Sequence, residues 1–316
     1  MGAFVHEIRL KSLHRFGRRA PPGPLGELLR CLPRLVRGAV LMAIVKRSRL
    51  KNPPEWVSAA ADIRLVDYAG QEEDTILQLE APQLGKAASA LYVQKEFWPT
   101  LPAPEDTCMD LLADILNELS VFDRDSEHFD RNLLHQLTTF YSRIQTSFEA
   151  IEISGRRYPQ ERPVRVDQHL LETVHQISAR IPEAQRVRVV GTLDMIRAST
   201  RSCAIRLLHG QEVPCVLLKG DVRKISGLLT KPVLVLGWVQ YKPSGRVLRI
   251  DAEDIRPAQK EDIAFWSRLP SPQLPEADLT IFRYPQGPRS GVAAVLGHWP
   301  GNETDEEINA WLREIS

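Results

Sequence analysis

Arg186-Val-Arg-Val-Val-Gly-Thr-Leu-Asp-Met195 begins the region that decides the fold class of this 316-residue chain. Apolar and polar residues alternate in it, which is the pattern of a β-strand with one buried face. Strand-like runs continue at residues 203–208, 212–218, 232–240 and 246–251. Residues 186–256 are therefore predicted to form a unit of five short strands.

The order of elements in this region resembles the oligonucleotide/oligosaccharide-binding (OB) fold. Three strands come first, then a short helix over 222–229 with Asp221 as its cap, then two strands. The OB fold is a five-stranded Greek-key barrel. Gly191 and Gly237 lie inside strands, where sharp bends of a barrel require glycine. An SH3-like barrel and a simple meander also fit this order.

The resemblance implies a ligand site on the second and third strands, bordered by the first–second and fourth–fifth loops. The first loop spans 196–202 and the other spans 241–245. Cations for phosphates and a ring for a base suit single-stranded nucleic acid. We expect Trp238 to lie in the core. The expected nucleic-acid-binding residues are Arg197, Arg201, Arg206, Tyr241 and Lys242.

Charge alternates along the chain although its total is only +1. Residues 1–50 carry a net charge of +9, residues 51–150 carry −11, and residues 186–256 carry +7. Such blocks indicate either neighbouring segments that pair with each other or surfaces that face polyanions. For residues 1–50 we favour packing against the acidic segment that follows.

The region before the barrel is predicted to be rich in helix, which makes the fold class α+β. Apolar residues recur at helical spacing in 25–45, 56–61, 105–121 and 130–149, whereas 4–10 and 75–80 have strand patterns. Pro33 is expected to kink the first helix. We divide the chain into an α-rich domain (1–160), a connecting helix (161–185, helical over 164–181), the barrel (186–256) and a tail (257–316).

The tail is predicted to be a Pro-rich interaction segment that ends in a short helix opened by Thr304 and Glu307 as a capping box. The run from Gly297 to Glu307 resembles the tails of antitoxins that are paired with small PIN-domain ribonucleases. That resemblance implies a small metal-dependent ribonuclease as the partner of the tail. The alternative is a tail that folds back in cis on the chain's own body. The expected partner-binding residues are Arg283, Arg289, Trp299, Trp311 and Leu312.

Four cysteines in a chain of this length are too sparse for a disulfide framework, so buried free thiols and a cytoplasmic location are expected. The longest apolar run, 38–45, is too short to cross a bilayer, which needs about 20 residues. It is therefore predicted to be a buried or interfacial helix without a membrane partner.

No catalytic motif is present. Asp123-x-Asp125-x-Glu127 starts like a calcium loop, but His128 stands where glycine is required. We therefore predict no metal and no cofactor. The function expected first is a non-catalytic binding or adaptor protein that contacts nucleic acid or an acidic partner through the barrel loops. The alternatives are an antitoxin-like nuclease inhibitor and an enzyme with an unrecognised site in the α-rich domain.

Overall fold

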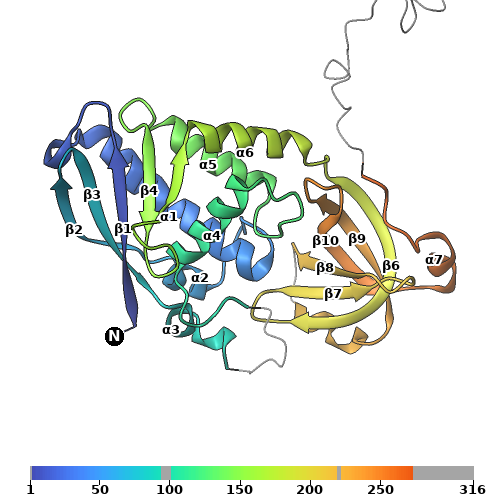
Figure 1. The fold of residues 1–316 in the computed structure, drawn as a ribbon. Helices are drawn as coiled ribbons and strands as arrows, with labels where there is room; N and C mark the ends of the chain where they lie inside the picture. Colours follow the sequence, from blue (N-terminus) through green and yellow to red (C-terminus); the bar gives the residue numbers. More distant parts are fainter. Residues whose placement is uncertain (1, 94–100, 219–221, 273–316) are drawn as a thin grey trace, which may run out of the picture. The chain divides into compact units, whose positions relative to one another are not determined.

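β1 (Ala3–Lys11) lies at the centre of a five-stranded antiparallel sheet in the N-terminal part of the chain (Figure 1). The computed structural model describes residues 2–93, 101–218 and 222–272. The strand order is β2-β3-β1-β4-β5. The other strands are β2 (Arg64–Gln71), β3 (Asp74–Pro82), β4 (Ala150–Ser154) and β5 (Val164–Asp167).

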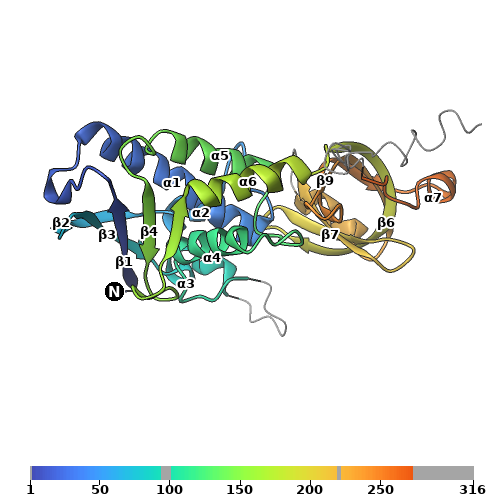
Figure 2. The same ribbon diagram turned by 45° about the horizontal axis from the view of Figure 1, so that its top comes forward.

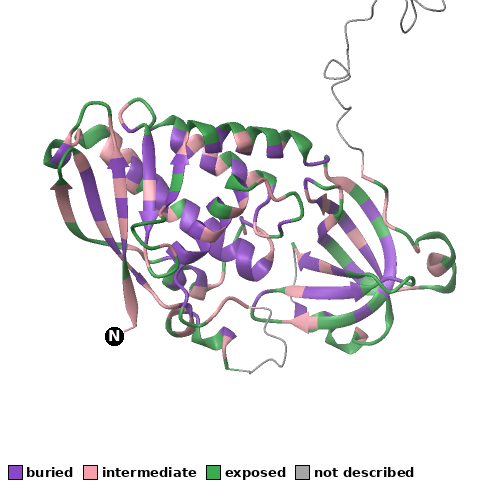
Figure 3. Cartoon of the chain, in the orientation of Figure 1, coloured by how far each residue is buried: buried purple, intermediate pink, exposed green. Residues whose placement is uncertain are grey.

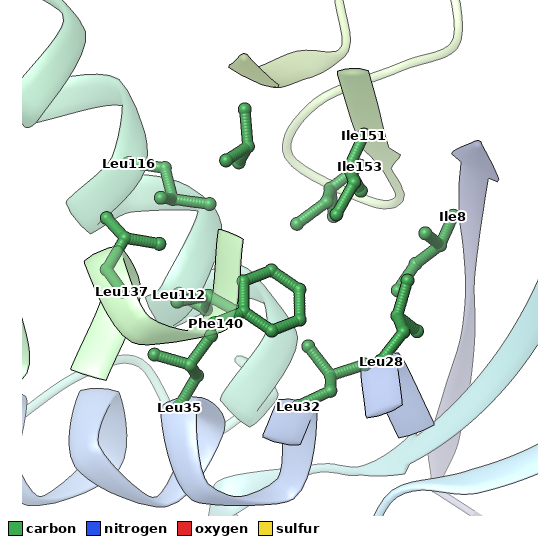
Figure 4. Close-up of a pocket in the computed structure, with 11 residues that line it drawn as sticks. Ile8, Leu28, Leu32, Leu35, Leu112, Leu116, Leu137, Phe140, Ile151 and Ile153 are labelled. Carbon is green, nitrogen blue, oxygen red and sulfur yellow. The ribbon is translucent and has the colours of Figure 1, made fainter. Parts of the chain in front are cut away.

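Four amphipathic helices supply the rest of this core. They are α1 (Pro22–Val45), α4 (Cys108–Ser120), α5 (Arg131–Ser142) and α6 (Gln168–Arg180). In Figure 2, α5 lies next to both α1 and α6, as their contacts require. Figure 4 shows leucines of α1 and α4 meeting Ile8, Ile151 and Ile153 of the sheet. The cavity among them is apolar and measures only about 10 Å³, so it is packed core and not a ligand site.

Shorter elements join these helices and strands. They are η1 (Gly17–Arg19), α2 (Glu55–Ala60), α3 (Leu84–Ala87) and η2 (Ser89–Leu91).

The predicted α+β class is confirmed, but the sheet is larger than the sequence patterns indicated. The predicted helix 130–149 ends at Ser142, and the first four residues of the predicted helix 164–181 form β5. Side chains of α6 belong to the same hydrophobic core as α1, so the predicted connecting helix packs within the N-terminal unit. Helix α1 continues through Pro33 to Val45, and its run 38–45 is buried as predicted.

Residues 185–257 form a closed five-stranded mixed β-barrel with strand order β10-β8-β7-β6-β9. Its strands are β6 (Gln185–Arg197), β7 (Ser202–Arg206), β8 (Glu212–Leu217), β9 (Pro232–Tyr241) and β10 (Val247–Pro257). β8 and β10 pair in parallel, whereas the other pairs are antiparallel. This closure excludes the simple meander and is compatible with an OB-like barrel.

The predicted helix between the third and fourth strands is present as a 3₁₀ segment, η3 (Val222–Leu228), while Asp221 lies outside the described residues. Gly237 has the predicted role, because an added Cβ would stand 2.3 Å from the carbonyl oxygen of Asp251. Figure 3 shows the buried residues that alternate along the strands.

The expectation that Trp238 lies in the core is wrong, since this side chain is 39 % exposed. Alternation along β9 points Val235, Val239 and Tyr241 inward and therefore points Trp238 outward.

The chain continues from β10 into the short helix α7 (Lys260–Phe265), which has no buried residue. The four cysteines are buried and free, as expected. Within the described part of the chain, no helix has the length and apolarity to cross a membrane.

Candidate functional site

An acidic turn, residues 123–130, joins α4 to α5 and lies against the second barrel loop, which joins β9 to β10. The turn ends in Asp130, whose side chain accepts the backbone N–H of Leu133 and caps α5. The backbone N–H of Ser244 donates to the carbonyl of Arg124 at 3.1 Å. The segment that resembled a calcium loop is therefore a contact surface for the barrel.

Three carboxylates of the acidic turn meet three cations of the barrel. Lys242 Nζ lies 2.8 Å from Glu127, and Arg246 Nη1 lies 3.6 Å from Asp125. Arg249 of β10 lies 3.3 Å from Asp130. The negative segment 51–150 thus pairs with the positive barrel, in addition to its contacts with residues 1–50 such as Lys11–Asp74 at 2.7 Å.

Arg249 is the most deeply buried member of this contact, with 4 % of its side chain exposed. Its Nε donates to Asp251 at 2.8 Å and its Nη1 donates to the carbonyl of Lys46 at 2.6 Å. Asp130 also accepts hydrogen bonds from the backbone and the hydroxyl of Ser48. A buried cation with this many partners is a structural anchor.

The other two pairs are more exposed, and their carboxylates, Asp125 and Glu127, have lowered pKa values. The pKa of Asp125 is lowered by its hydrogen bond with Ser244 and by the nearby Arg246. Burial of Glu127 opposes ionisation, but the hydrogen bond from Lys242 and the charge of Lys46 hold its pKa below the usual range. Both carboxylates are therefore held in the charged form.

Two of the predicted nucleic-acid-binding residues are not presented to solvent. Tyr241 is 2 % exposed and its hydroxyl donates to the carbonyl of Pro270 at 3.0 Å, so its ring does not offer a face to a base. Tyr241 points into the barrel because side chains alternate along β9, and the same alternation points Trp238 outward. Lys242 is 11 % exposed and holds Glu127, so an internal carboxylate takes the place expected for a phosphate.

Of the other three predicted residues, two lie at the first barrel loop and Arg206 lies at the opposite end of β7. Arg197 ends β6 and pairs in register with Ser202. Arg201 has a left-handed backbone (φ 53°) and its Nη1 donates to the carbonyl of Asn52 at 3.4 Å. Arg206, at the end of β7, is bound to Asp194 at 2.6 Å. The structure thus brings Arg197 and Arg201 together and leaves Arg206 in a separate ion pair.

A second cationic region, which the sequence reasoning missed, lies between α1, α5 and the connection that follows α1. We call it the basic groove. It has a volume of about 600 Å³ and a floor that includes Leu35, Leu41 and Phe140. Its walls carry the cationic side chains Arg34, Arg37, Arg49, Lys51 and Arg143 together with His135. No aspartate or glutamate of the described chain lines this groove.

The cations of the basic groove differ in their pairing. Arg143 is bound to Glu27 at 2.9 Å. For Arg34, Arg37, Arg49 and Lys51, the described structure gives no ion pair or side-chain hydrogen bond. The net charge of residues 1–50 is the sequence signal for this groove, but the prediction that this charge packs against the acidic segment accounts for only part of it.

A polar cavity of about 230 Å³ beside α4 bears on the enzyme alternative. It is lined by Lys46, Asp106, Asp114, His128 and Arg157, among others. Arg157 pairs with both aspartates, and Asp114 also accepts the Tyr158 hydroxyl at 2.9 Å. Burial raises the pKa of Asp114. These pairs attach the β4–β5 connection to α4, which is a structural role.

The predicted tail residues Arg283, Arg289, Trp299, Trp311 and Leu312 lie outside the described residues, so the antitoxin hypothesis stays a prediction. In the described residues, no group of three or more His, Cys, Asp or Glu side chains is placed to hold a metal ion. Comparison of the chain with family models, curated proteins and solved structures found no match.

Proposed function

We propose that this chain is a non-catalytic protein that binds single-stranded nucleic acid, with the loops of the barrel as a contact surface. We take the barrel to be of the OB type. Ligands of OB folds bind on the second and third strands, between the first–second loop and the fourth–fifth loop. Fold alone does not determine function, so the proposal depends on the chemistry of the loops.

One observation carries this proposal: the second loop already binds anions in the folded chain. Lys242 and Arg246 hold the carboxylates of Glu127 and Asp125. Of these two pairs, Arg246–Asp125 is exposed, whereas Lys242 is only 11 % exposed. Exposed ion pairs contribute little net free energy, about 0–1 kcal/mol, because water solvates both partners well. A phosphate can therefore replace Asp125 on Arg246 at low cost.

The first loop provides the second half of the contact surface. Arg201 is exposed, and its Nη1 donates to the neutral carbonyl of Asn52, which does not neutralise its charge. Phosphate contacts made by such cations supply most of the affinity for a nucleic-acid backbone and make it depend on salt.

The test is a fluorescence anisotropy titration of a labelled single-stranded oligonucleotide at several salt concentrations. We expect Arg197→Glu/Arg201→Glu to weaken binding at least about tenfold, because two phosphate contacts become repulsive. Arg64→Glu/Lys86→Glu is the charge-matched control in the N-terminal unit. Unchanged affinity in the loop variant, or an equal loss in the control, would contradict a role for the barrel.

The acidic turn offers an independent variant of opposite sign. Asp125→Asn/Glu127→Gln removes the competing carboxylates from Arg246 and Lys242. If phosphates compete for the same cations, oligonucleotide binding becomes several-fold tighter. Unchanged binding would limit the contact surface to the first loop.

A further inference from the structure

The basic groove concentrates positive charge, and in the described residues only Arg143 among its arginines and lysine has a carboxylate partner. Arg34 and Arg37 are three residues apart on α1, so their side chains leave the same face of the helix. Arg49 and Lys51 extend this face from the connection that follows. Like charges held this close repel one another, and a bound anion relieves that repulsion.

The groove also has the other features of a binding site. Its volume of about 600 Å³ lies within the range of ligand-binding clefts, about 300–1,000 Å³. Its apolar lining residues Leu35, Leu41 and Phe140 are themselves buried, so the exposed part of the groove is chiefly cationic and polar. Asn132, Gln136 and Thr139 of α5 add hydrogen-bonding groups. Cations next to hydrogen-bonding groups suit a ligand that carries phosphates.

The groove adjoins the first barrel loop through its own wall. Lys51 and Pro53 line the groove, and the carbonyl of Asn52 between them accepts the hydrogen bond from Arg201. Close by, Trp56 Nε1 donates to the carbonyl of Ser199 in the same loop, at 3.3 Å. Cations of the groove and of the barrel loop are thus connected through residues 51–56.

We infer that the basic groove is a second binding site, one that holds the phosphate backbone of the same nucleic-acid strand that the barrel loop contacts. This inference rests on the proposed function. A strand is favoured over a mononucleotide because the cations come from three segments, namely α1, the connection that follows it and the first barrel loop, which residues 51–56 link. The groove therefore adds affinity that is independent of base sequence.

The experiment compares two double variants in the full chain. Arg34→Gln/Arg37→Gln removes two groove cations. Arg30→Gln/Arg64→Gln removes two exposed arginines that pair locally with Glu27 and Asp62 and do not line the groove. Anisotropy titrations with a labelled single-stranded oligonucleotide are run over a series of salt concentrations. Circular dichroism establishes that each variant is folded.

We expect the groove variant to bind about tenfold or more weakly than the control variant. Each phosphate contact contributes about 0.7 to the slope of log K against log salt for single strands, so two lost contacts make the slope about 1.4 less steep. Equal affinities and slopes in the two variants overturn the groove site.

Other outcomes separate this inference from the proposed function. Loss of binding in Arg197→Glu/Arg201→Glu but not in the groove variant leaves the barrel proposal intact and removes the groove. Loss in the groove variant alone contradicts the barrel contact, and with it the inference that one strand reaches both sites. A wild-type chain that binds no oligonucleotide overturns both. Competition by a nucleoside triphosphate at concentrations far below those of inorganic phosphate assigns the groove to a small ligand and contradicts the strand.

Discussion

The second barrel loop and the basic groove are both rich in cations, but their cations differ in what neutralises them. Lys242, Arg246 and Arg249 each have a carboxylate partner in the acidic turn. Arg34 and Arg37 line a groove to which the described chain contributes no carboxylate. The same residue types therefore stabilise a contact within the chain in one region and, by our inference, bind a ligand in the other.

A block of charge in a sequence therefore does not by itself indicate whether its side chains form internal ion pairs or remain available to a ligand. Residues 1–50 and 186–256 are both strongly basic. Part of each block pairs with residues 51–150, as the Lys11–Asp74 and Lys242–Glu127 contacts demonstrate. The remaining cations are the candidates for ligand binding. Only the folded structure distinguishes them from the cations that have carboxylate partners.

The largest effect that would sharpen this comparison is expected from Asp130→Ala. It leaves Arg249 buried with less neutralisation, removes the cap of α5 and removes two hydrogen bonds from Ser48. Breaking a buried ion pair from one side costs about 3–5 kcal/mol. Urea denaturation measures the free energy of unfolding, and Arg246→Ala, in an exposed pair of the same contact, is the control. Similar losses in both variants would contradict the assignment of Arg249 as the anchor.

A smaller effect is expected from pH. The pKa of Glu127 lies below its ordinary value of 4.5, so its ion pair stabilises the fold above that pH and is lost as the pH falls through the lowered pKa. The wild type should exceed Glu127→Gln in urea midpoint at neutral pH, and the gap should close under acid conditions. A gap that is constant with pH would show that the charge of Glu127 contributes nothing.

The smallest effect is expected from the groove. Arg34→Ala/Arg37→Ala removes exposed cations without partners in the described structure, so the free energy of unfolding should change by no more than about 0.5 kcal/mol per site. The same denaturation measurement applies. A loss of several kcal/mol would mean that these arginines maintain the fold, and the distinction between the two regions would fail.

Much of the fold was predictable from residue patterns. The alternation that begins at Arg186 predicted five strands, and Gly237 occupies the close strand approach for which it was singled out. The helical spacing in 25–45 predicted α1. The sheet was underestimated because β4 and β5 are short, and because β2 is largely exposed and lacks a strong alternation.

The candidate site was less predictable. Arg197 and Arg201 lie at the expected loop, but Tyr241 points inward and Lys242 holds Glu127. Counting alternate residues along β9 would have placed Tyr241 inside and Trp238 outside. The net charge of residues 1–50 was the one sequence signal for the groove, but it could not locate it, since its walls come from α1, α5 and the connection between α1 and α2.

The sequence by itself determined the order of the elements, the alternation that closes a barrel, and the burial of 38–45, because these depend on the spacing of apolar residues along one segment. Only the tertiary structure decided which cations have partners. Coulombic attraction acts between groups that are close in space, and Arg249 and Asp130 stand 119 residues apart in the chain.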